Sequence, residues 1–233
     1  MENVYGIGFD LDHTLAIDNR LERVALLHLL ELVLADGGRT LGTLADEIEN
    51  IDTLLTHQRR GEFTIDEAVR RFTAEHGLEP RESYVEFFRA TAVGMVGEFV
   101  VPLPGAQRTL ARLRERGITL AVLTNGWNPM QRLKAEQAGF LGPILVSSEI
   151  GVRKPEPGAF EILLRTLGTQ PQQTLYVGDD ASSDVAGAQR AGMQTAWINW
   201  ERLEYPPEQR PPDHTIGALD ELPALIAAPV RVS

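Results

Sequence analysis

The second half of the chain alternates short apolar runs with amphipathic segments, and this alternation limits the possible folds more than any other feature. From about residue 104 onward, each apolar run has the length of a strand and each segment after it has helical spacing. Strands that alternate with helices form a parallel sheet covered by helices. We therefore expect an α/β fold with a Rossmann-like parallel sheet core and helices on both faces. The segments are ITLAVLT, PMQRLKAEQAG, ILVSS, PGAFEILLRTLG, TLYVGD, DVAGAQRAG and QTAWIN.

A long helical insertion interrupts this pattern after the first strand, which is expected at Val4–Phe9. Roughly residues 18–100 have the pattern of successive helices instead of one short crossover. We expect two domains, a core domain of residues 1–17 and 101–233 and an α-helical cap domain of residues 18–100.

Two local patterns predict helices within the insertion. Thr64 is followed three positions later by Glu67, which is a capping-box pattern and predicts a helix start. An apolar series at helical spacing predicts one buried helix face. This series is Leu21, Val24, Leu27 and Leu30.

The composition excludes several classes of partner. A formal net charge of −11 disfavours nucleic acid polymers and anionic membranes, which both reward clustered Lys and Arg. The longest apolar stretch, VALLHLLELVLA, contains His28 and Glu31 and is too short to span a bilayer. The chain has no cysteine, which fits a reducing compartment. Because the start of the sequence lacks a signal-peptide pattern, we expect a cytoplasmic protein. We also expect a monomer or homodimer that acts on a small molecule.

The stretch FDLDHTLA places two acids at the carboxyl end of the first strand. Asp10 and Asp12 are two positions apart, so their side chains point the same way. Two carboxylates about 4 Å apart repel by on the order of 4 kcal/mol at an effective dielectric near 20. A cation, a shared proton or a splayed loop would relieve this repulsion, and a metal ion is the simplest of these remedies. The alternative is an ordinary turn at Asp12-His13-Thr14.

Polar residues follow the other expected strands as well. Ligands of open parallel sheets bind where the carboxyl ends of the strands meet, so these residues are expected to converge. Taken singly, the lysine could be a solvated surface residue and the threonine a helix cap. Together they predict a site for a divalent metal and a phosphate group. The residues are Thr124, Asn125, Lys154, Asp179, Asp180 and Asp184.

Four motifs in this order resemble the haloacid dehalogenase superfamily of hydrolases, in the branch whose helical cap follows the first motif. The motifs are FDLDHTLA, VLTNG, the Lys154-Pro155 segment and VGDDASSDVAGAQRAGM, and the resemblance covers nearly the whole chain. It implies that Asp10 is the nucleophile that forms an aspartyl-phosphate. It implies further that Asp12 protonates the leaving oxygen and then activates water.

The resemblance also implies how phosphate and metal are held. Thr124 and Lys154 would hold the phosphoryl oxygens, and the backbone turn at Asn125 is expected to bind an anionic oxygen of the substrate as well. Mg²⁺ would be bound by Asp10, by the backbone carbonyl of Asp12 and by Asp179. Asp184 would be a further ligand or would orient a metal-bound water or Lys154. Asp180 would be a ligand or a solvated neighbour of the site.

The function that the resemblance implies is a Mg²⁺-dependent phosphatase for a small phosphorylated metabolite. The second acid, Asp12, favours this over a dehalogenase, which attacks carbon, needs no metal and lacks that acid. The alternatives are a phosphotransferase or mutase and a catalytically silent phosphate-binding protein.

Aromatic residues near the expected site have two interpretations. Trp127 could stack on the base, flavin or sugar of a substrate, or it could pack within the protein. The TNG sequence followed by a bulky residue resembles nucleotide and flavin-mononucleotide phosphatases of this branch. Trp197 and Trp200 are expected to be structural.

Overall fold

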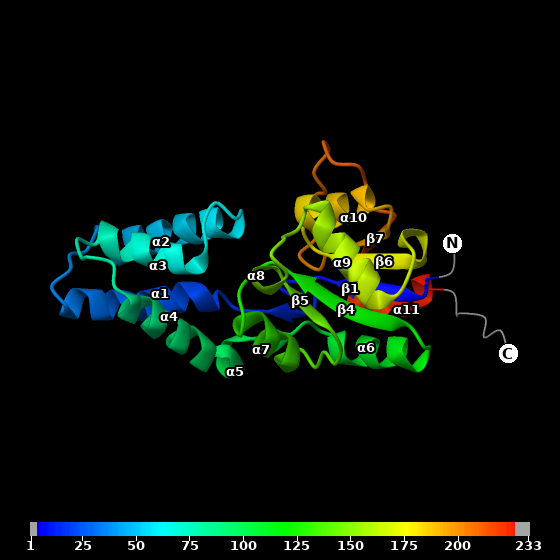
Figure 1. The fold of residues 1–233 in the computed structure, drawn as a ribbon, viewed down its shortest axis with the longest axis horizontal. Coiled ribbons are helices and arrows are strands. Elements are labelled where there is room, and N and C mark those ends of the chain that lie inside the picture. Colours follow the sequence, from blue (N-terminus) through cyan, green and yellow to red (C-terminus); the bar gives the residue numbers. More distant parts are fainter. Residues whose placement is uncertain (1–3, 227–233) are drawn as a thin grey trace. The chain divides into compact units, whose positions relative to one another are not determined.

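The protein is described by a computed structural model that covers residues 4–226. Two compact units make up the chain (Figure 1). The core unit combines the chain up to Asp18 with the chain from Val100 onward, and the helical unit is Asn19–Phe99. The chain passes from one unit to the other at two points, after Asp18 and after Phe99. Each point lies one residue from the domain boundary expected from the sequence.

The core unit is built on a six-stranded sheet in the order β5-β4-β1-β6-β7-β8. Every neighbouring pair of strands in it is parallel, which confirms the predicted fold class. The strands are β1 (Gly6–Phe9), β4 (Thr119–Thr124), β5 (Ile144–Val146), β6 (Thr174–Gly178), β7 (Gln194–Ile198) and β8 (His214–Ile216). A separate antiparallel pair joins β2 (Ala16–Ile17) to β3 (Val101–Pro102).

Helices cover both faces of the sheet. In Figure 1, α9 and α10 lie on one face and α6 lies on the other, with α11 beside it. The helices of the core unit are α6 (Ala106–Glu115), α7 (Met130–Gln137), α8 (Ser147–Ile150), α9 (Pro157–Leu167), α10 (Ala186–Arg190) and α11 (Leu222–Leu225). Three short turns of other helix types are η1 (Pro171–Gln173), the π-helix η2 (Ala181–Val185) and η3 (Leu219–Glu221).

A buried cluster fixes α9 against the sheet and thereby orients the strand ends. Phe160 and Leu163 of α9 are fully buried together with Tyr176 of β6. The helix approaches β1 so closely that a Cβ at Gly8 would lie 2.5 Å from Leu163 and 2.8 Å from Tyr176. Only glycine fits this position of the central strand without displacing the core.

The helical unit contains α1 (Leu21–Ala35), α2 (Leu44–Arg59), α3 (Ile65–Glu75), α4 (Glu82–Gly94) and the short α5 (Val96–Phe99). Helix α1 packs against α2 and α4, and α3 packs against the same two helices. Within residues 4–226, the helices lack the combination of length and apolar character that a membrane span requires.

The predicted helix start at Thr64 is present, because its side chain accepts a hydrogen bond from the Glu67 backbone N–H at 3.2 Å. The full capping box occurs at α2 instead, between Thr43 and Asp46.

The buried face of α1 differs from the expected one. Val24 and Leu27 are only half-buried, whereas Ala25, Leu26 and Leu29 are fully buried. The reason is that α1 contacts helices on two sides, which widens and rotates its apolar face.

Candidate active site

Asp10 leaves the centre of the sheet at the carboxyl end of β1. Its backbone N–H donates to the Val177 carbonyl at 2.9 Å, which continues the ladder between β1 and β6. Because β1 lies between β4 and β6, Asp10 emerges between the ends of two neighbouring strands, at Thr124 and Asp179. Its side chain is 11% exposed, so the carboxylate is largely removed from water.

Lys154 binds two of the acids. Its side chain is 3% exposed, and its Nζ donates to Asp10 Oδ1 at 2.5 Å and to Asp184 Oδ1 at 2.7 Å. The backbone of Lys154 is held by Asn125, whose Nδ2 donates to the Lys154 carbonyl and whose Oδ1 accepts from the Lys154 N–H, both at 2.9 Å. The side chain of Asn125 therefore positions the lysine, a role that the sequence pattern does not predict.

Three carboxylates come together at this edge of the sheet. Asp10, Asp179 and Asp184 each offer one oxygen, and these oxygens lie within 4.8 Å of one another. Asp184 reaches the cluster from η2, and a Cβ at Gly178 would lie 2.3 Å from its Oδ2. The absence of a side chain at Gly178 makes room for this carboxylate. The arrangement is compatible with a bound metal ion.

The charges of the cluster are unbalanced. Burial raises the pKa of Asp10 and Asp184, the latter to about 7, in spite of the opposing effect of Lys154. Burial and the neighbouring acids Asp10 and Asp184 raise the pKa of Asp179 well above its usual value. Burial acts to lower the pKa of Lys154, but Asp10 and Asp184 outweigh it and raise that pKa well above the usual value. One ammonium group thus faces three acids, and the site favours additional positive charge.

Asp12 is held on a different side of the site. Its Oδ1 accepts from Lys134 Nζ and its Oδ2 accepts from Gln131 Nε2, both at 2.8 Å. The carboxylate of Asp12 is therefore directed at α7. Asp18 Oδ2 accepts a second hydrogen bond from Lys134 Nζ at 2.9 Å.

Thr124 ends β4 and is buried, with 1% of its surface exposed. Its Oγ1 accepts from Gln131 Nε2 at 2.7 Å. The hydroxyl of Thr124 donates only a long hydrogen bond, to the Asn125 carbonyl at 3.4 Å, which a closer anionic oxygen would replace.

Asp180 is exposed beside the site, which fits the solvated neighbour expected of it. Its Oδ1 accepts from the backbone N–H groups of Ser182 at 2.9 Å and Ser183 at 2.6 Å, so it caps η2. This capping starts the turn that carries Asp184.

Of the tryptophans near the site, Trp127 and Trp197 are buried and Trp200 is half-buried. Trp127 is 5% exposed, which fits packing within the protein rather than an open stacking surface. Trp197 is also 5% exposed, and its Nε1 donates to the Asp179 carbonyl at 2.6 Å. Trp200 Nε1 donates to the His13 carbonyl at 2.9 Å, and the two rings are stacked. Trp197 and Trp200 thus support the backbone at Asp179 and His13.

Sequence reasoning missed Lys134, Gln131 and Asp18. Gln131 and Lys134 are three positions apart in α7, hence on one helix face, and both are buried although they are polar. The signal that could have identified them is a lysine and a glutamine on one face of the helix that follows the TNG loop. Polar residues on a buried helix face usually have a partner, and here the partners are acids.

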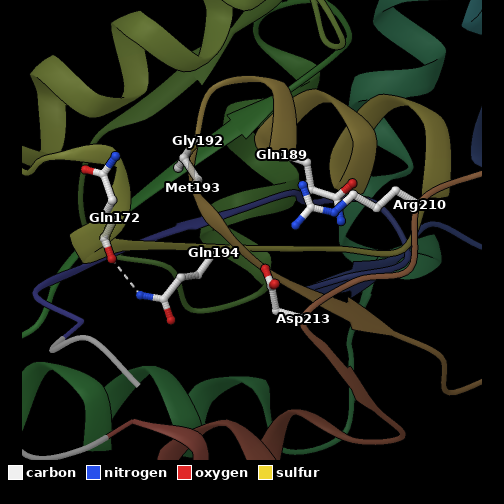
Figure 2. Close-up of a pocket in the computed structure, with 7 residues that line it drawn as sticks. All are labelled: Gln172, Gln189, Gly192, Met193, Gln194, Arg210 and Asp213. Carbon is white, nitrogen blue, oxygen red and sulfur yellow. Dashed lines mark hydrogen bonds between the residues drawn. The ribbon is translucent and has the colours of Figure 1, made fainter.

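A surface pocket of about 270 Å³ lies elsewhere on the core unit (Figure 2). Its polar lining is largely engaged in local contacts, since Gln194 Nε2 donates to the Gln172 carbonyl and Gln189 Nε2 donates to the Pro211 carbonyl. Asp213 Oδ2 accepts from the Thr195 backbone and hydroxyl groups. The carboxylate cluster is therefore the stronger candidate for catalysis.

The chain is also similar to known proteins. The family model of the haloacid dehalogenase-like hydrolases matches residues 6–192. A glyceraldehyde 3-phosphate phosphatase from Pyrococcus furiosus is 27% identical over 97% of this chain and 93% of its own length.

Two solved structures are similar over nearly their whole length. The HAD-hydrolase YfnB from Bacillus subtilis has a TM-score of 0.74 and 24% identity, covering 97% of this chain and 99% of that one. A 2-haloacid dehalogenase from Pseudomonas syringae pv. Tomato DC3000 has a TM-score of 0.71 and 26% identity, covering 95% and 97%. The chain is therefore similar both to a protein named as a phosphatase and to one named as a dehalogenase.

Proposed function

The chain belongs to the haloacid dehalogenase-like hydrolases, and from this we propose that it is a Mg²⁺-dependent phosphatase of a small phosphorylated metabolite. The observation that carries the proposal is the buried contact of Lys154 with Asp10 and Asp184 beside a second acid, Asp12. The phosphatase from Pyrococcus furiosus, which aligns with almost the whole chain, supports it.

The acids of the cluster fit a magnesium ion. Asp10, Asp179 and Asp184 offer carboxylate oxygens, the ligands that Mg²⁺ prefers, within 4.8 Å of one another. The raised pKa values of all three carboxyl groups indicate a shortage of positive charge that a divalent cation would relieve. When bound, the ion would neutralise charge on the phosphoryl oxygens.

We assign the first chemical step to Asp10. An oxygen of its carboxylate attacks phosphorus, the bond from phosphorus to the ester oxygen breaks, and Asp12 donates a proton to that departing oxygen. Lys154 and the Thr124 hydroxyl are placed to bind phosphoryl oxygens, which stabilises the charge that develops there.

The second step returns the enzyme to its starting state. Asp12, now ionised, accepts a proton from water as the water oxygen attacks phosphorus. The bond from phosphorus to Asp10 breaks, and inorganic phosphate leaves. The same side chain thus serves as acid and then as base, as in other two-step displacements.

A second candidate reaction is dehalogenation, which the likeness to the 2-haloacid dehalogenase favours. Asp10 would then attack carbon and displace halide. The hydrogen-bonded second acid, Asp12, argues for phosphate ester chemistry, because a departing alkoxide needs a proton and a departing halide does not.

Release of inorganic phosphate from a panel of phosphomonoesters, with Mg²⁺ and with chelator, tests the proposal. We expect release that requires the metal, and the best ester identifies the substrate class. Halide release from 2-haloacids that persists in chelator would favour the dehalogenase. Transfer of the phosphoryl group to an organic acceptor would indicate a phosphotransferase or mutase, and phosphate binding without turnover would indicate a silent binding protein.

A further inference from the structure

Asp12 is held by two side chains that the proposed mechanism does not use. Lys134 Nζ and Gln131 Nε2 each donate to one oxygen of its carboxyl group at 2.8 Å. Both donors belong to α7 and lie about one turn apart. A single helix therefore contacts both oxygens, which restricts the carboxyl group in position and in rotation.

The exposed fractions of the three side chains show on which side of Asp12 the two donors lie. The side chain of Lys134 is 3% exposed and Gln131 is 2% exposed, whereas the side chain of Asp12 is 29% exposed. The donors thus lie on the protein side of Asp12, and the exposed part of the carboxyl group remains accessible. Each carboxyl oxygen has more than one acceptor position, so one donor on each leaves room for the proton that Asp12 transfers.

The two donors are themselves fixed by further contacts. Lys134 Nζ donates to Asp18 Oδ2 at 2.9 Å, and the Asp18 side chain is 9% exposed. Gln131 Nε2 donates to the hydroxyl of Thr124 at 2.7 Å. A buried ammonium group that is bonded to two acids has little freedom to turn, so Asp18 anchors the lysine that holds Asp12.

From this network, and resting on the phosphatase function proposed above, we propose that Lys134 and Gln131 are positioning residues for Asp12. They hold its carboxyl group in the orientation from which it protonates the leaving oxygen, and Asp18 anchors Lys134.

The proposal predicts an effect that depends on the leaving group. Phenyl phosphate needs a proton on its departing oxygen, whereas 2,4-dinitrophenyl phosphate releases a stable anion. The constant kcat/KM reports the steps up to that departure. We expect Lys134→Met to lower kcat/KM about 100-fold for phenyl phosphate, near the lower end of what general acid catalysis contributes, and by less than about threefold for the dinitrophenyl ester.

Two controls separate positioning from a general structural effect. Arg132→Met removes a cation from the same helix, but this side chain is 43% exposed and pairs with Glu149, so kcat/KM for both esters should stay within about twofold of wild type. In an Asp12→Asn background, Lys134→Met should cause no further loss with phenyl phosphate, because the group it positions can no longer donate the proton.

Removal of a buried cation could prevent folding, so a second variant is included. Lys134→Met combined with Asp18→Asn removes one charge of each sign, and tryptophan fluorescence tests whether the core unit of this variant is folded. The same leaving-group dependence is expected in this variant.

Each remaining outcome overturns the inference. A loss that is equal for both esters would mean a structural role for Lys134, and no loss would mean that Asp12 needs no positioning. In both cases the wild type still releases phosphate, so the proposed function stands. Wild-type protein that hydrolyses neither ester nor any other phosphomonoester would refute the proposed function and the inference with it.

Discussion

Replacing Lys154 with methionine removes the ammonium group that lies between Asp10 and Asp184. The two contacts are 2.5 and 2.7 Å long, and the three side chains are 3%, 11% and 1% exposed. At an effective dielectric near 20, each attraction is roughly 6 kcal/mol, but burial of the charges offsets much of it. Breaking a buried ion pair by removing one partner costs about 3–5 kcal/mol of unfolding free energy, and we expect that loss in metal-free protein at pH 7.

Urea unfolding followed by tryptophan fluorescence measures this loss. The three tryptophans of the chain all lie in the core unit, so the signal reports on that unit alone. Lys154→Met should shift the midpoint with an unchanged m-value. In a thermal scan the same loss corresponds to a drop of roughly 6–20 °C for a chain of this size.

The control is Arg165→Met, which removes a cation that is 68% exposed and 3.9 Å from Glu161. Exposed pairs of this kind contribute about 0–1 kcal/mol, so its unfolding should match wild type closely. At pH 5.5 the penalty of Lys154→Met should shrink, because the acids that it leaves behind take up protons. A variant whose unfolding free energy at pH 7 lies within about 0.5 kcal/mol of wild type would refute the account of the cluster.

Two further predictions concern the metal and the core. The pKa of Asp184 is raised to about 7 and those of Asp10 and Asp179 are also raised, so protons compete with Mg²⁺ below neutral pH. The apparent affinity for Mg²⁺ should therefore fall as pH decreases through about 7. Titration calorimetry at pH 5.5 and at pH 8 measures this affinity, and equal affinity at the two pH values would contradict the prediction. Phe160→Ala should cost about 3–5 kcal/mol of core-unit stability, because this fully buried ring packs α9 on the sheet, and a loss below about 1 kcal/mol would argue against that packing.

The strands and helices of the core unit were predictable, because their apolar residues repeat at short, regular intervals in the sequence. Strand length and helical spacing predicted the parallel sheet, and the carboxyl ends of its strands brought Asp10, Asp179 and Asp184 together as the sheet topology requires. Their order in the chain is enough for this, because parallel strands place successive ends at one edge.

The contacts between elements were not predictable. Nothing local to Asp12 shows that Lys134, 122 residues away in the chain, contacts its carboxylate. Asp180 has the same residue type and nearly the same place as Asp179, yet it caps a turn, because η2 starts directly after it. The buried face of α1 depends on which helices pack against it, and the sequence of α1 alone does not show which helices these are.

The same limit applies to Asn125. Its position after β4 predicts that the backbone turn contacts phosphate, which stays a prediction, and its side chain bonds the backbone of Lys154. Residue type alone does not distinguish an amide that binds substrate from one that positions the residue that does.

We propose above all that Asp10 is the nucleophile of a metal-dependent phosphatase. The most direct measurement is the rate of inorganic phosphate release by wild type and Asp10→Asn, side by side, with Mg²⁺ and the best ester of the panel. We expect metal-dependent release by wild type and a loss of at least about 10³-fold in the variant, with tryptophan fluorescence showing an intact core unit. A folded Asp10→Asn protein that releases phosphate at the wild-type rate would contradict the proposal.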